Sequence, residues 1–64
     1  MDKKLAALNN ILLAMLGSQD LVDKWWKNSN KHWDGCTPDT IYLIEPQEVI
    51  NYVLEHYQKW AIQY

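Results

Sequence analysis

The stretch PQEVINYVLEHYQKWA, residues 46–61, carries the clearest structural pattern in the chain. Its apolar side chains return every three or four residues, which is the spacing of one face of an α-helix. These side chains belong to Val49, Ile50, Val53, Leu54, Tyr57, Trp60 and Ala61. Pro46 suits the first position of a helix, because the N–H group that proline lacks has no partner there. The stretch therefore predicts a long amphipathic helix over residues 46–62.

Two shorter stretches with helical periodicity lie nearer the N-terminus. In residues 2–16 the repeated apolar positions are Leu5, Leu8, Leu12, Met15 and Leu16. Asp2 is expected to cap the start of this helix, and Gly17 to end it in a left-handed backbone conformation. Ser18 is then expected to cap a second helix over residues 19–28. The apolar stripe of that helix consists of Leu21, Val22, Trp25 and Trp26.

A third helix is predicted over residues 38–44. Thr37 is expected to cap it, and Pro38 suits its first helical position. Pro46 ends it, since the residue before a proline is disfavoured in helical geometry. The side expected to face the core consists of Ile41, Tyr42 and Ile44.

Residues 28–36, between the second and third helices, predict an ordered loop. Asn28-Ser29-Asn30 ends the second helix, because these side chains compete for backbone hydrogen bonds. Trp33 is expected to insert its ring into the core, and Asp34-Gly35 is a turn signal. The chain thus predicts one all-α domain, residues 1–64. It is a compact bundle of four helices, at about 2–16, 19–28, 38–44 and 46–62, joined by short loops.

Size and charge limit the classes of function. Sixty-four residues allow one small domain, which buries only about 60% of the surface of its unfolded chain. Six lysines, no arginine and eight acidic residues give a net charge of −2, so we expect no nucleic-acid partner. The longest apolar run, residues 11–16, is too short to span a bilayer, so no membrane partner is expected. A free thiol and the lack of an export signal predict the cytoplasm.

Few residues in the chain are suited to catalysis or cofactor binding. The single cysteine, Cys36, excludes an internal disulfide, and no cysteine–histidine cluster is spaced to hold a metal. A thiol–imidazole pair between Cys36 and His32 lacks a third orienting group and any known cysteine-enzyme signature. With only two glycines, the chain has no phosphate-binding loop. We therefore expect no enzymatic activity and no cofactor.

Aromatic residues are the compositional anomaly. The chain has four tryptophans and four tyrosines but no phenylalanine, and both residue types are enriched at binding hot spots. Trp25 and Trp26 are adjacent, about 100° apart on a helix, so both cannot point into one narrow core. Trp25 is predicted to be the buried anchor and Trp26 the more exposed residue. The candidate protein-binding residues are Trp26, His32, Trp33, Tyr57, Trp60 and Tyr64.

Residues 16–38 carry a more specific pattern at fixed spacing. It consists of Leu16-Gly17-Ser18, Trp25-Trp26, Asn30, Trp33 and Gly35-Cys36-Thr37-Pro38. This pattern resembles the toxin-binding domain of Xre/MbcA/ParS-type antitoxins, and stand-alone versions of that domain are similar to small bacteriophage proteins. The resemblance implies a helical scaffold whose motif residues are Gly17, Ser18, Trp25, Asn30, Gly35, Thr37 and Pro38. It also implies a role in a bacterial host cell, where such antitoxins occlude the active sites of NAD-consuming toxins.

Together these features predict a non-enzymatic protein-binding module. It would capture and inhibit a protein partner, either a toxin or a host defence enzyme, through aromatic and apolar side chains. The alternative is a structural homo-oligomeric phage protein, assembled as a homodimer or larger oligomer through the last helix. A third class, a small hydrolase or thiol enzyme, would depend on Cys36.

Overall fold

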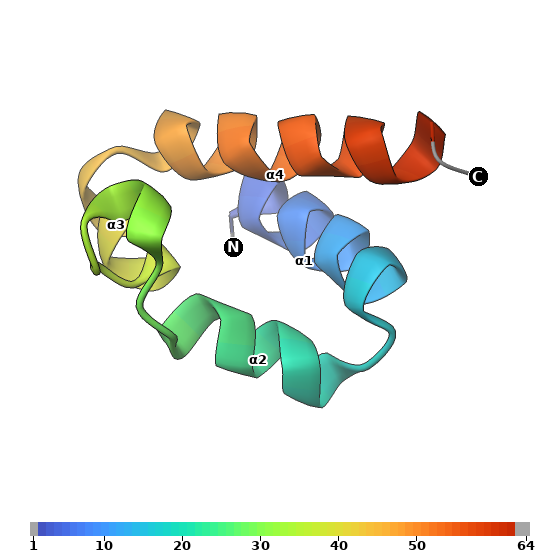
Figure 1. Cartoon of the computed structure of the whole chain (residues 1–64), viewed down its shortest axis with the longest axis horizontal. Coiled ribbons are helices and arrows are strands. Elements are labelled where there is room, and N and C mark those ends of the chain that lie inside the picture. The colour runs from blue at the N-terminus through green and yellow to red at the C-terminus, as the bar shows by residue number, and fades with distance from the viewer. Residues whose placement is uncertain (1, 63–64) are drawn as a thin grey trace.

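The computed structural model describes the backbone of residues 2–62 and the side chains of residues 2–60 (Figure 1). Its elements are α1 (Lys3–Leu16), α2 (Gln19–Lys27), the 3₁₀ turn η1 (Lys31–Trp33), α3 (Pro38–Ile44) and α4 (Pro46–Ile62). The predicted all-α class and the four helices are confirmed, with bounds that differ from the predicted ones by at most one residue.

The capping residues expected at both ends of α1 and at the start of α2 are present. The Asp2 carboxylate accepts hydrogen bonds from the backbone N–H groups of Lys4, at 2.9 Å, and Leu5, at 3.3 Å. Gly17 ends α1 with a φ of 93°, in the left-handed region that glycine tolerates best. One residue later, the Ser18 hydroxyl accepts from the N–H of Leu21 at 3.3 Å and starts α2. Local signals therefore determine the reversal between the first two helices.

The side-chain cap predicted for α3 is not formed. Thr37 occupies the N-cap position with extended backbone, but its side chain accepts no backbone hydrogen bond. Its hydroxyl instead donates to the Asp39 carboxylate, which also accepts from the N–H of Thr40 at 2.7 Å. Hydrogen bonds to an ionised group are stronger than those between neutral groups, and this explains why the hydroxyl turns to Asp39.

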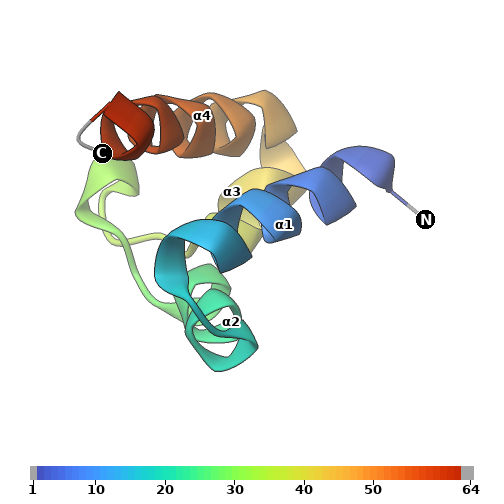
Figure 2. The same ribbon diagram turned by 90° about the vertical axis from the view of Figure 1, so that its right-hand side faces the viewer.

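The helices form a ring in which each packs on two others. α1 packs on α2 and α4, and α3 packs on the same two helices from the other side. Figures 1 and 2 both show α1 between α4 and α2, with α3 beside the start of α4. Because no helix is surrounded, each has a face that stays in water.

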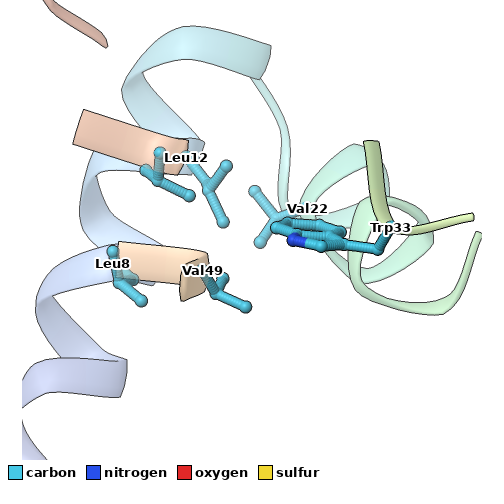
Figure 3. Close-up of a cluster of buried hydrophobic side chains, with 6 residues drawn as sticks. Leu8, Leu12, Val22, Trp33 and Val49 are labelled. Atoms are coloured by element: carbon cyan, nitrogen blue, oxygen red, sulfur yellow. The ribbon is translucent and has the colours of Figure 1, made fainter. Parts of the chain in front are cut away.

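Six side chains from four elements make the buried core. They are Leu8, Leu12, Val22, Trp33, Val49 and Val53. The Trp33 ring enters from η1 and lies against Val22, while Leu8, Leu12 and Val49 approach from the opposite side (Figure 3). Only 8% of Trp33 is exposed, so the prediction that it inserts into the core is confirmed. Its indole N–H is buried without a hydrogen-bond partner.

The loop that carries Trp33 is ordered by its own backbone. Asn30 N–H donates to the Cys36 carbonyl and Gly35 N–H to the Asn30 carbonyl, both at 3.0 Å. The Asn30 side chain caps η1 by accepting from the N–H of His32 at 2.9 Å. Asp34 and Gly35 follow with φ values of 55° and 86°, which make the predicted tight turn. These contacts fix the position of the Trp33 backbone, and hence of its ring.

The burial pattern corrects two expectations about individual side chains. Trp25 and Trp26 are both partly buried, and their rings meet edge to face at a centroid distance of 5.0 Å. The prediction that Trp25 is fully buried is therefore wrong. Ile44, predicted to face the core, is 72% exposed, because α3 ends there before the chain turns into α4 at Pro46.

Candidate protein-binding surface

The most exposed large apolar side chains lie at the end of α3. Leu43 is 86% exposed and Ile44 72% exposed, well above the other large apolar side chains of the described residues. Single exposed apolar residues are ordinary, but adjacent ones beside a concave surface are typical of interaction sites. We call these two residues, with the hollows on either side of them, the α3 edge.

Hollow A lies between α3, the first half of α1 and the end of α2, with a volume of about 350 Å³. It is lined by Leu5, Asn9, Trp26, Lys27, Asp39, Tyr42 and Leu43. The indole N–H of Trp26 donates to the Asn9 side-chain oxygen at 2.7 Å. The same ring meets Tyr42 edge to face at a centroid distance of 5.8 Å. The aromatic walls of hollow A are thus held in place before anything binds.

Hollow B lies on the other side of Tyr42, where the start of α1 faces the junction of α3 and α4. It is larger, at about 880 Å³. Its lining residues are Asp2, Lys3, Lys4, Tyr42, Ile44, Glu45, Pro46, Gln47, Glu48, Ile50 and Asn51. Both signs of charge are present, so hollow B is not selective for a strongly acidic or strongly basic ligand.

Tyr42 forms the wall that the two hollows share. Its hydroxyl donates to the Asp2 carboxylate at 2.5 Å, which links α3 to the start of α1. This hydrogen bond is the main reason that the pKa of Asp2 lies below its ordinary value. It also raises the pKa of the Tyr42 hydroxyl, with desolvation adding to the effect. The link therefore needs an ionised Asp2 and a protonated Tyr42.

We expect the stabilisation from this link to be confined to a window of pH. Since folding lowers the Asp2 pKa, its contribution is present above the unfolded value, about 4, and is lost as the pH falls through the folded value. Since folding raises the Tyr42 pKa, its contribution is present below about 10 and is lost as the pH rises further. Melting temperatures of the wild type and Tyr42→Phe should differ at neutral pH and converge at both extremes. A difference that is constant from pH 3 to pH 11 would contradict this expectation.

A second aromatic cluster surrounds Tyr52 on α4. The Tyr52 ring lies 4.8 Å from Trp33, 4.8 Å from His32 and 4.2 Å from His56, measured between ring centroids. The Asn30 side-chain amide donates to its hydroxyl at 3.4 Å. This cluster attaches the Trp33 loop to α4. Two of its members, His32 and His56, are exposed at the surface, whereas Trp33 is buried.

The structure distributes the predicted binding residues that it describes over four places. Trp26 lines hollow A, and His32 is exposed on the Tyr52 cluster. Trp33 is a core residue, which corrects its assignment to a binding surface. Tyr57 and Trp60 lie in the second half of α4, which runs away from α3 (Figure 1). The centroids of their two rings are 5.8 Å apart. Tyr64 lies outside the described residues.

Sequence reasoning missed Leu43 and Ile44, although a signal was present. Ile41, Tyr42, Leu43 and Ile44 are four consecutive apolar residues on one short helix. At about 100° per residue they point around most of the helix circumference, so a core on one side cannot cover all four. A seven-residue helix with such a run must leave part of it in water.

Other kinds of site are not apparent in the described part of the chain. Residues 2–62 contain no group of three or more His, Cys, Asp or Glu side chains placed to hold a metal ion. In the same residues, no single helix is long and apolar enough to cross a membrane; only the bent pair of residues 3–16 and 19–33 has the length and composition. No family model matches the chain, and neither a curated protein nor a solved structure shows significant similarity to it.

Proposed function

We propose that this domain is a non-enzymatic protein-binding module that captures and inhibits a protein partner, and that it binds through the α3 edge. The observation that supports this most is the exposure of Leu43 and Ile44 beside hollow A, whose walls include Trp26 and Tyr42. Tryptophan and tyrosine dominate hot spots, where an apolar anchor fills a pocket. An exposed apolar pair next to an aromatic hollow offers both parts of such a contact.

The geometry favours a partner that presents one apolar side chain to hollow A. The Trp26 ring is held by Asn9, and Tyr42 by Asp2, so few side chains need to be ordered on binding. Less ordering leaves more of the contact energy for affinity. Lys27 and Asp39 on the rim provide one charge of each sign for polar groups around the anchor.

The resemblance of residues 16–38 to antitoxin toxin-binding domains supports the class of partner. We take the partner to be a toxin or a host defence enzyme in the bacterial cytoplasm. Inhibition would follow from steric occlusion of its active site, as the resemblance implies. Occlusion of this kind is stoichiometric: one domain blocks one site.

Once a partner enzyme has been isolated by affinity capture with the domain, titration of that enzyme with the purified domain tests this function. We expect its activity to fall linearly and to reach its minimum at one domain per active site. The Leu43→Glu variant should need a large excess for the same effect. If the activity stays constant at saturating domain, the domain binds this partner without inhibiting it, and the proposal is wrong in that respect.

A second candidate function is a structural homo-oligomer assembled through α4. Leu54 and Tyr57 are exposed on its apolar stripe, beyond the part that the core covers. Exposed apolar side chains of this kind can form a contact between copies. Replacement of Tyr57 by lysine should then lower the mass in solution while leaving the melting temperature unchanged. Capture of a partner would be unaffected by Tyr57→Lys if the α3 edge is the binding surface.

A further inference from the structure

The α3 edge carries a protruding apolar side chain and a hollow that fits one, side by side on the same face. Leu43 is almost wholly exposed, and it borders hollow A, which has a volume of about 350 Å³. We infer that a second copy of the chain occupies this surface, with Leu43 of each copy inserted into hollow A of the other. This inference rests on the proposed function, which makes the α3 edge the binding surface. The second copy would occupy that surface when no other partner is bound.

Twofold symmetry makes this exchange self-consistent. In an isologous contact the same patch serves both copies, so a patch needs to contain both the projection and its receptor. The α3 edge contains both, since Leu43 is the projection and the rings of Trp26 and Tyr42 form the receptor walls. The two insertions are then equivalent. Both copies use the same surface in the contact, so the assembly stops at a dimer.

The charges on the surface permit contact between identical copies. The rim of hollow A carries one cation, Lys27, and one anion, Asp39. The pKa of Asp39 is lowered mainly by its hydrogen bonds with Thr37 and the N–H of Thr40, so this residue is the anion of the pair at neutral pH. A rim of balanced charge does not repel its own copy, and the whole chain carries only −2.

A dimer contact of ordinary size would take up a modest part of the surface of this domain. A standard protein contact covers about 800 Å² on each side, which is about a sixth of the 4825 Å² surface of this domain. The apolar centre of the α3 edge consists of few residues, so we expect a weak dimer. A weak dimer keeps Leu43 and Ile44 out of water and is displaced when a tighter partner takes the surface.

Sedimentation equilibrium of the purified domain at increasing concentration, up to about 1 mM, tests this inference. We expect the wild-type mass to rise from 7.6 kDa toward twice that value. Leu43→Glu should weaken the dimer about 30-fold or more, the effect of losing a hot spot, with an unchanged circular-dichroism spectrum. Leu21→Glu is the matched control, because Leu21 is also exposed but lies in the first turn of α2, whereas hollow A is lined by Trp26 and Lys27 at the end of that helix.

Each other outcome overturns the inference. A wild type that stays at 7.6 kDa throughout has no such dimer. Dimerisation that survives Leu43→Glu, or that is abolished by Tyr57→Lys instead, places the contact elsewhere. If the wild type is monomeric while Leu43→Glu still loses the captured partner, the proposed function stands and only self-association fails.

Discussion

Replacement of Trp33 by alanine is expected to abolish cooperative unfolding of the domain at room temperature. Removing a buried tryptophan side chain costs about 3–5 kcal/mol, because apolar contacts are lost and a cavity remains. The free energy of unfolding of a domain of this size is about 3–10 kcal/mol. Trp33 packs in the core and also contacts Tyr52. Within the described residues, its loss leaves residues 30–36 attached to α4 only through Asn30 and His32. Thermal unfolding followed by far-ultraviolet circular dichroism measures the effect.

Trp33→Phe is the matched control for this prediction. Phenylalanine keeps an aromatic ring in the core and removes the indole N–H, which is buried without a partner. An unsatisfied buried donor costs about 1–3 kcal/mol, and this gain offsets much of the lost volume. We expect Trp33→Phe to change the free energy of unfolding by about 1 kcal/mol or less. A Trp33→Ala protein that melts like the wild type would show that the ring is not a core residue.

The second large effect is expected at Leu12. Leu12, in the second half of α1, is 3% exposed, and truncation to alanine should cost about 2–5 kcal/mol. Leu13, the next residue, is 39% exposed, and the same truncation there should cost less than about 1 kcal/mol. Helix propensity changes equally in the two variants, so the difference in urea midpoint reports burial alone. Equal midpoints would mean that α1 presents a different face to the core.

Much of the fold follows from signals that lie within a few residues of the element they specify. The Asp2 and Ser18 caps, the left-handed Gly17 and the proline starts of α3 and α4 are all local, and all are found where the sequence predicts them. The helix bounds follow from them. The periodicity of residues 46–61 likewise predicts which side of α4 faces the core at Val49 and Val53.

The candidate surface was harder to predict, because exposure depends on which helices pack together. Trp25 and Trp26 look unequal on a helical wheel, yet both are partly buried, since α2 packs on α1 on one side and α3 on the other. Ile44 was expected in the core, but its place depends on where the chain turns between α3 and α4. The Thr37 hydroxyl had two acceptable partners, and the choice of Asp39 depends on side-chain geometry that spacing does not specify.

Quantitative affinity capture from cells of the native host, with three forms of the domain, tests most directly whether the α3 edge binds a protein. The wild type, Leu43→Glu and Leu21→Glu are compared at equal loading after circular dichroism shows that all three are folded. We expect the proteins enriched by the wild type to fall about 30-fold or more with Leu43→Glu, and to be unchanged with Leu21→Glu. Equal enrichment by Leu43→Glu and the wild type would contradict binding through the α3 edge.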